Sequence, residues 1–187
     1  EATLAALEYL GRDPEGFFLV VEQGDIDWAN HDNDFRSMIG CVADLDEAVR
    51  VALAYVDRPG DAVDWTNTVL LVTADHATGG LMLDKPLGPG DLPAQTERIA
   101  LAKAGEPGEA PNGAAIKSPG YVSPFVYPGG EVSYGTAGHT NELVDLAATG
   151  AAARLFLRYR GTWYPGNIID NTQINAALRR ALRLPSR

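Results

Sequence analysis

The stretch GFFLVVEQGDIDWANHDND, residues 16–34, joins an apolar run to a turn crowded with acidic side chains. The run at 16–21 has no polar side chain, which is typical of a short strand covered on both faces. The ionisable side chains that follow it are Glu22, Asp25, Asp27, His31, Asp32 and Asp34. Because like charges repel one another, this turn is either well solvated or holds a cation.

The composition limits the classes of protein to consider. The chain has 187 residues, 45% of them hydrophobic, enough for one sizeable core and at most two domains. A net charge of -10 argues against nucleic acid as a partner, since phosphate binding needs Lys and Arg. No apolar run approaches the length of a membrane span. Cys41 is the only cysteine, so no internal disulfide is expected.

The first residues already follow a helical pattern, with leucines at positions 4, 7 and 10. There is no initiator Met and no signal peptide at this end. We therefore expect a piece of a longer protein, in which case missing targeting signals carry little information.

A long helix is predicted to follow the acidic turn, capped by Asp32, Asn33 or Asp34. Its apolar positions recur at helical spacing: Met38, Val42, Leu45, Val49, Leu53 and Val56. Pro59 and Gly60 are expected to end it. TVLLVTA at 68–74 is predicted to be a second buried strand, and a helix of this length between two strands fits a parallel crossover.

Residues 84–130 differ in composition from the rest of the chain, with Pro and Gly every few positions around one helical stretch, ERIALAKA at 97–104. We expect an insertion over one end of the sheet rather than a second core. LVDLAAT at 143–149 is a third strand candidate. Asp170, with Gln173 three residues on, is predicted to open a terminal helix. The apolar side of that helix is Ile174, Ala177, Leu178 and Leu182.

All three histidines follow β-type runs in turns rich in Gly, Asp or Thr: DIDWANH, TADHATGG and GTAGHT. In open α/β sheets such segments meet beyond the carboxyl ends of the strands, where ligands bind. Asp27 and His31 are four residues apart, so one helical turn puts them on the same face. Asp75 and His76 share a site only if the backbone turns, which the sequence ATGG at 77–80 permits.

Imidazole and carboxylate together are a common ligand set for catalytic zinc. Each feature also has an ordinary structural explanation. His31 fits a loop or cap, Asp75 and His76 fit a hydrogen-bonded turn, and Trp28 is expected to pack rather than to stack on a substrate. The coincidence of all three histidines in the same kind of position favours a metal site.

Four segments, taken in order, resemble the C-terminal half of bacterial alkaline phosphatases: GFFLVVEQGDIDWANHDND, TVLLVTADHATGG, GHTNE and IDNTQI. The resemblance covers nearly the whole chain apart from the insertion. It implies an α/β fold, a three-layer αβα sandwich present as a C-terminal portion. Residues 1–187 would then be part of one alkaline phosphatase-like domain, with 84–130 inserted over its active-site end.

The resemblance also implies two zinc ions and one magnesium ion, which would offset the crowded carboxylates. Their expected ligands are Asp27, His31 and His139 for one zinc, Asp75 and His76 as part of the second zinc site, and Glu22 for the magnesium.

The implied reaction is hydrolysis of phosphate monoesters through a phosphoserine intermediate. No Asp-Ser-Ala nucleophile occurs here, because the serines at 37, 118, 123, 133 and 186 lie in other contexts. The nucleophilic Ser is therefore expected upstream, and this chain alone is expected to be inactive. The implied partners are phosphate monoesters, inorganic phosphate, the protein's own N-terminal half and a second copy in a homodimer. The implied location is periplasmic or extracellular.

Two alternatives remain open. One is a phosphodiesterase, sulfatase or phosphomutase of the same superfamily, although HATGG and GHTNE favour the phosphatase. The other is a non-catalytic metal-binding chain that stabilises or partners another protein.

Overall fold

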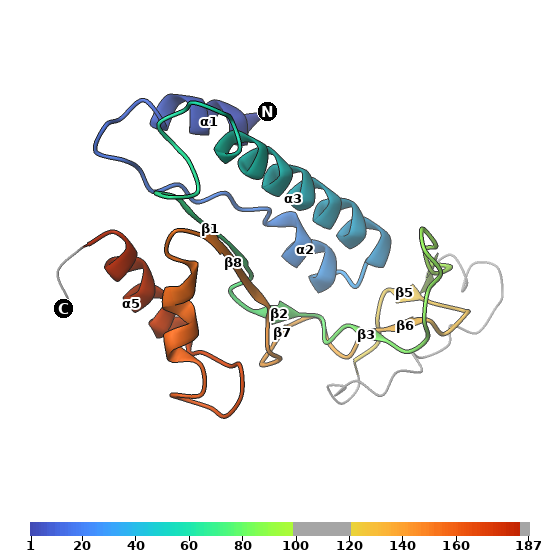
Figure 1. The fold of residues 1–187 in the computed structure, drawn as a ribbon. Helices are drawn as coiled ribbons and strands as arrows, with labels where there is room; N and C mark the ends of the chain where they lie inside the picture. Colours follow the sequence, from blue (N-terminus) through green and yellow to red (C-terminus); the bar gives the residue numbers. More distant parts are fainter. Residues whose placement is uncertain (99–120, 184–187) are drawn as a thin grey trace. The chain divides into compact units, whose positions relative to one another are not determined.

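The computed structural model describes residues 1–98 and 121–183, which form helices and short strands (Figure 1). In chain order the elements are α1 (Ala2–Leu10), α2 (Asp25–His31), α3 (Phe35–Val56), β1 (Val69–Thr73), β2 (Ala77–Thr78), β3 (Met82–Leu83), β4 (Thr96–Glu97), β5 (Phe125–Val126), β6 (Val132–Ser133), β7 (His139–Thr140), β8 (Leu146–Gly150), the 3-10 helix η1 (Ala153–Tyr159) and α5 (Asn171–Ala181). Among the described helices, none is both long and apolar enough to cross a membrane.

The chain divides into two compact units. The first unit comprises Glu1–Leu19, Val49–Thr73 and Asp145–Arg187, and the second comprises Val20–Ala48 and Ala74–Val144. The expectation that all 187 residues belong to one domain stays a prediction.

The first unit is built on the pair of strands β1 and β8. They run antiparallel, with Val69 opposite Gly150 and Thr73 opposite Leu146. Within this unit, Figure 1 shows α1 and the end of α3 on one side of the pair, and η1 and α5 on the other. Leu7, Tyr55 and Val56 form a buried cluster of this unit, and Phe156 of η1 and Ala177 of α5 are also buried. Strands between two helical layers are the arrangement expected of a three-layer α/β fold.

Strand pairing differs from the sequence prediction in two respects. The strand predicted at 143–149 begins three residues later, because the register against β1 starts at Leu146 and leaves Leu143 72% exposed. The parallel crossover predicted between residues 16–21 and 68–74 is wrong for the described residues, where β1 pairs only with the antiparallel β8.

Residues 17–21 are extended but are not a strand. Phe17 and Leu19 pack against the first unit's core, whereas Phe18 and Val20 are 61% and 70% exposed. This alternation is that of a strand with one face covered, so the prediction of a strand covered on both faces is wrong. The physical reason is the lack of a neighbour: within residues 1–98 and 121–183, no backbone group pairs with 17–21.

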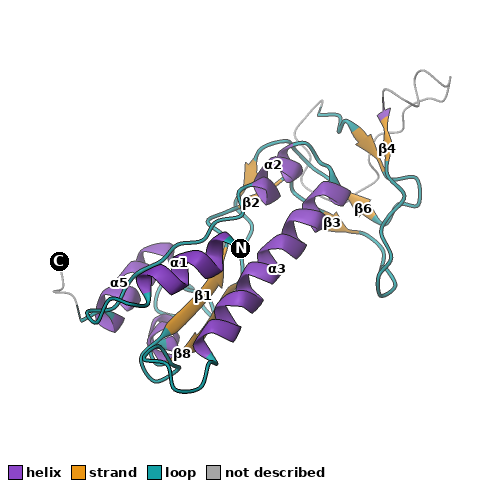
Figure 2. Cartoon of the chain, turned by 90° about the horizontal axis from the view of Figure 1, so that it is seen from above, coloured by secondary structure: helices purple, strands orange, loops and turns teal. Residues whose placement is uncertain are grey.

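The second unit has three ladders of two residue pairs each, β2 with β7, β3 with β6 and β4 with β5. Figure 2 shows β3 beside β6. Its core consists of Ala29, Phe35, Met38, Tyr127, Val132 and Tyr134. The described ends of the predicted insertion thus contribute β4, β5 and core side chains. Of the helix predicted at 97–104, Glu97 belongs to β4, while 99–104 lie outside the described residues.

Both predicted helix caps are present. Asp34 caps α3: its carboxylate accepts from the backbone N of Ser37 at 3.0 Å and from the Ser37 hydroxyl at 2.7 Å. Asp170 and Gln173 form the predicted capping box at the start of α5. Helix α3 ends at Val56, three residues before Pro59, as the spacing predicts.

Replacing Asp34 with Ala should destabilise the chain by about 1 kcal/mol at neutral pH. Burial raises the pKa of Asp34, but hydrogen bonds from Ser37, Gln95 and Arg36 outweigh it, and the net pKa lies below its usual value. A carboxyl with a depressed folded-state pKa stabilises above its unfolded pKa of about 3.9 and loses this effect as the pH falls through the folded value. Urea unfolding should therefore show a difference from wild type that shrinks under acid conditions. Asp44→Ala, which removes the same charge from the exposed middle of α3, is the control and should cause no loss.

Candidate metal centre

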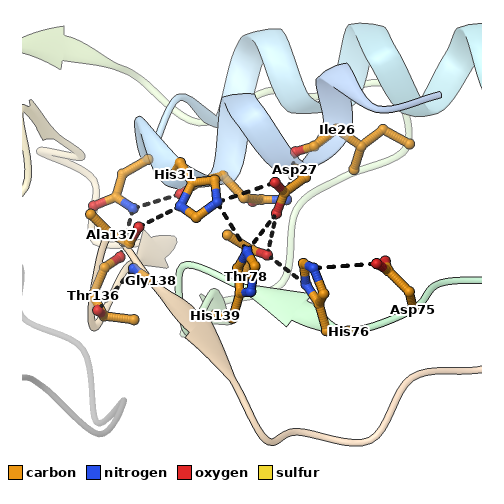
Figure 3. Close-up of polar contacts among 12 residues, drawn as sticks. Ile26, Asp27, His31, Asp75, His76, Thr78, Thr136, Ala137, Gly138 and His139 are labelled. Atoms are coloured by element: carbon orange, nitrogen blue, oxygen red, sulfur yellow. Dashed lines mark hydrogen bonds and ion pairs between the residues drawn. The ribbon is translucent and has the colours of Figure 1, made fainter.

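Helix α2 carries the first two predicted ligands on one face. Asp27 and His31 are separated by one turn, and Oδ2 of Asp27 lies 3.1 Å from Nε2 of His31 (Figure 3). The two acidic residues in the first turn, Asp25 and Asp27, complement the positive end of the helix dipole. The i, i+4 spacing read from the sequence therefore places both side chains as predicted.

His31 is oriented by a backbone carbonyl. Its Nδ1 lies 2.5 Å from the carbonyl oxygen of Ala137. Because a carbonyl oxygen only accepts hydrogen bonds, Nδ1 carries a proton, and whenever the ring is neutral Nε2 presents its lone pair. A histidine whose other ring nitrogen donates to a carbonyl is the usual arrangement of a metal ligand.

His139 reaches the same place from strand β7. The ladder with β2 sets His139 opposite Thr78. Nε2 of His139 lies 3.1 Å from Nε2 of His31 and 3.8 Å from Oδ1 of Asp27. The three residues predicted to hold one zinc ion therefore converge in the second unit.

The turn after β2 is possible only with glycine. Gly79 has a φ of +83°, and a Cβ there would lie 2.8 Å from the Tyr134 ring and 2.9 Å from the carbonyl oxygen of Asn30. The amide of Gly79 donates to the carbonyl of Gly138 at 2.9 Å, which brings the residue before His139 against β2. The backbone turn predicted at 77–80 is thus present.

Asp75 and His76 also lie together. The backbone bends at Asp75, and its Oδ2 is 3.4 Å from Nε2 of His76. The His76 ring stacks on that of His139, with centroids 3.6 Å apart. The Asp75 side chain is 89% exposed, so this pair forms the open edge of the cluster.

Thr78 is a site residue that the sequence prediction missed. Its hydroxyl donates to Oδ1 of Asp27 at 2.5 Å, and its oxygen lies 3.2 Å from Nδ1 of His76. The hydroxyl has one proton, so its lone pair accepts from Nδ1–H of His76, and Nε2 of His76 faces Oδ2 of Asp75. The extended-chain period of two was the available signal, because Thr78 of β2 comes two positions after His76.

The spacing of these atoms fits a metal ion. Ligand atoms about 2 Å from a tetrahedral zinc lie about 3.3 Å from one another. Nε2 of His31 lies 3.1 Å from Oδ2 of Asp27 and 3.1 Å from Nε2 of His139, both close to that value, while the 3.8 Å separation joins Nε2 of His139 to the other carboxylate oxygen, Oδ1 of Asp27. A second combination, Asp27, His76 and His139, also offers three ligand atoms, all within 4.8 Å of one another. Asp27 and His139 belong to both sets.

The charge state of Asp27 suits a ligand. Burial raises the pKa of Asp27, but the hydrogen bond from Thr78 and the nearby imidazoles of His31, His139 and His76 outweigh it, so the net pKa lies below its usual value. The carboxylate is therefore ionised at neutral pH and available to a cation.

Two predictions at this end of the chain have different outcomes. Glu22 is exposed, and within residues 1–98 and 121–183 it makes no hydrogen bond or ion pair with the cluster, so its assignment to magnesium stays a prediction. The prediction that Trp28 packs is wrong, because its side chain is 70% exposed. Trp28 follows Asp27 on α2 and turns away from the buried face that Ala29 occupies.

Residues 1–184 match the sequence profile of the family described as alkaline phosphatase. Alkaline phosphatase H of Pseudomonas aeruginosa (strain UCBPP-PA14) is 29% identical over 184 residues, which cover 98% of this chain and 31% of that protein. The alkaline phosphatase of Escherichia coli (strain K12) is 42% identical over 77 residues, 41% of this chain and 15% of that protein.

Solved structures agree on the fold. The alkaline phosphatase from the Antarctic bacterium TAB5 superposes with a TM-score of 0.60 at 24% identity, over 99% of this chain and 40% of that one. This chain thus spans less than a third of these two curated relatives and two fifths of the TAB5 enzyme. The family match and the shared α/β fold of the alkaline phosphatase type show that this chain belongs to the alkaline phosphatase family.

Proposed function

We propose that this chain supplies most of the metal ligands of a phosphate monoesterase of the alkaline phosphatase type. The observation that carries the proposal is the convergence of Asp27, His31 and His139 at distances suited to one zinc ion. Asp75 and His76 would supply part of a second zinc site, and Glu22 the neighbouring magnesium site. A variant of the TAB5 alkaline phosphatase with Mg bound in its M3 site supports magnesium as the third ion.

The chain's own residues prepare the site before any ion binds. Thr78 holds one carboxylate oxygen of Asp27 and leaves Oδ2 facing His31. The Ala137 carbonyl and the Thr78 hydroxyl keep ring protons of His31 and His76 at Nδ1, which turns Nε2 of His31 toward Oδ2 of Asp27 and Nε2 of His76 toward Oδ2 of Asp75. When bound, zinc supplies Lewis acidity that stabilises the attacking and leaving oxygens of a phosphoryl transfer.

The nucleophile belongs to another part of the proposed protein. None of the serines in these 187 residues follows Asp and precedes Ala, the context expected of the phosphoserine. We propose that the serine lies upstream, together with the Asp that bridges zinc to magnesium and the Arg that binds phosphate in enzymes of this family, and that the upstream half is this chain's partner. The extended backbone at 17–21, with Phe18 and Val20 exposed, offers a strand edge to that half. A homodimer of the whole protein and a periplasmic or extracellular location complete the proposal.

The purified chain should bind about one zinc ion tightly, because one complete set of three catalytic-type ligands is present. Metal analysis after dialysis should show the zinc lost in His139→Ala and in Asp27→Asn. The matched control is Asp25→Asn, which makes the same change two residues earlier on α2 at an exposed position and should retain the metal. Zinc content unaffected by His139→Ala would contradict the ligand assignment.

Chelation should lower the thermal stability of the chain. A metal that binds only the folded state stabilises it by about 2.7 kcal/mol at a free concentration one hundred times its Kd. For a chain of this size that corresponds to a fall of roughly 5–10 °C in Tm when EDTA is added at pH 8. The fall should be smaller in acid, where the ligands protonate and hold metal weakly. A Tm indifferent to EDTA at pH 8 would favour a solvated acidic turn.

Catalysis should require the upstream half. With zinc and magnesium added, the isolated chain should hydrolyse p-nitrophenyl phosphate negligibly at alkaline pH, since it lacks the covalent nucleophile and most substrate positioning. Co-expression with the upstream half should restore turnover, and Asp75→Ala or His76→Ala should reduce it at least about a hundredfold.

Two outcomes would overturn this proposal. Robust activity of the isolated chain would place a nucleophile within the 187 residues. A folded, metal-loaded complex that acts on phosphate diesters or sulfate esters but on no phosphate monoester would favour the superfamily alternative.

A further inference from the structure

Asn33 is a fully enclosed polar residue close in the chain to the predicted ligand His31. It lies between α2 and α3, is 0% exposed and has a φ of +56°. Asparagine adopts this left-handed conformation more readily than most residues. A buried amide is costly unless its polar groups are bonded, so its contacts define what it does here.

The side chain of Asn33 joins three segments. Its Nδ2 donates to the carbonyl oxygens of Asn30 at 2.8 Å and of Thr136 at 2.9 Å. Its Oδ1 accepts from the hydroxyl of Tyr121. The orientation of the amide follows from these partners, because two carbonyl oxygens require the donor nitrogen and leave the oxygen for the hydroxyl.

The two carbonyls that this amide holds are adjacent to the ligands. Asn30 immediately precedes His31 at the end of α2. Thr136 immediately precedes Ala137, whose carbonyl accepts the hydrogen bond from Nδ1 of His31. His139 comes two residues after Ala137. The amide therefore ties the last turn of α2 to the loop that carries the third histidine, at the point where the two ligand-bearing segments must meet.

Two tyrosines from the described end of the insertion secure Asn33. The Tyr127 hydroxyl donates to the backbone carbonyl of Asn33 at 2.5 Å and accepts from the backbone N of Phe35 at 3.1 Å. Burial raises the pKa of Tyr127 to about 12, and burial together with the negative charge of Asp32 raises that of Tyr121. Both hydroxyls are therefore protonated donors throughout the neutral and mildly alkaline range.

We propose that Asn33 is a positioning residue that holds the loop 136–139 at metal-binding distance from α2, and that Tyr121 fixes its amide. The inference rests on the proposed function for the identity of the metal. It gives residues 121–130, the described end of the Pro/Gly-rich insertion, a structural role, because Tyr121 and Tyr127 support the metal centre through Asn33. The hydrogen bonds of Tyr121 and Tyr127 described above go to Asn33 and not to a predicted metal ligand.

The test compares zinc affinity across variants of the full chain by competition with a chelating dye. Asn33→Gly keeps the left-handed backbone and removes the amide, whereas Asn33→Asp keeps the shape and removes both donors. We expect each to weaken zinc binding by at least about tenfold, the range seen when partners of metal ligands are removed. Tyr121→Phe should weaken it by a smaller factor.

Controls separate positioning from a general loss of stability. Ala177→Gly destabilises the buried face of α5 in the first unit, and Tyr9→Phe removes an exposed hydroxyl from α1. Both should bind zinc as wild type does, including when Ala177→Gly lowers the melting temperature of the metal-free chain as much as Asn33→Gly.

A second readout needs no metal. Nitrogen NMR of the three imidazoles in the metal-free chain should show His31 protonated at Nδ1 in wild type and exchanging between tautomers in Asn33→Gly. If wild type binds no zinc, or Asp27→Asn binds it equally well, the proposed function fails while this NMR comparison still decides the role of Asn33. Zinc affinity within about twofold of wild type for both Asn33 variants, with the His31 proton retained at Nδ1, would overturn the inference.

Discussion

One hydrogen bond, from Nδ1 of His31 to the carbonyl of Ala137, determines how the second unit presents its imidazoles. It joins residues 106 positions apart in the sequence, so it is a product of folding and not of local chain geometry. It fixes the tautomer of His31 and holds the loop before His139 against α2 at the same time. The two hydrogen bonds that Nδ2 of Asn33 donates, to the carbonyls of Asn30 and Thr136, also hold this loop against α2. A site that depends on such bonds is ordered without a ligand, which would reduce the ordering cost of binding the proposed metal ion.

Local hydrogen bonds compensate the negative charge of individual carboxylates in this acidic chain. Asp34 is surrounded by donors from the start of α3 and from Gln95, and Asp27 receives the Thr78 hydroxyl and faces three imidazoles. The depressed pKa values of these two carboxyls show that their charges are compensated. Asp25 and Asp75 remain exposed to water. The crowded turn after residue 21 is therefore a mixture, in which one carboxylate caps a helix, one serves the cluster and others are solvated.

The sequence predicted features that depend on local interactions, but not those that depend on contacts between distant segments. Local patterns predicted four features: the caps at Asp34 and Asp170, the long helix α3, strand β1 and the shared face of Asp27 and His31. The structure contains all of them. The convergence of the three histidines was predicted because their surroundings were alike. The antiparallel partner of β1 and the bonds of Thr78 and Asn33 depend on which distant segments meet. Periodicity in one segment carries no information about its partner, so the parallel crossover was wrong and Asn33 was considered only as a cap.

The half-covered segment 17–21 has a consequence for handling the chain in solution. An extended backbone with free hydrogen-bonding groups and apolar side chains on its outer face is a template on which other strands can add, and long assemblies grow from such edges. None of residues 17–21 has a charged side chain that would discourage such strand addition. What opposes it is the net charge of -10, whose repulsion between molecules acts over about 10 Å in 0.1 M salt and over about 3 Å in 1 M salt. Colloidal stability of the isolated chain therefore falls as ionic strength rises, and dilute buffer is the condition that keeps it dispersed.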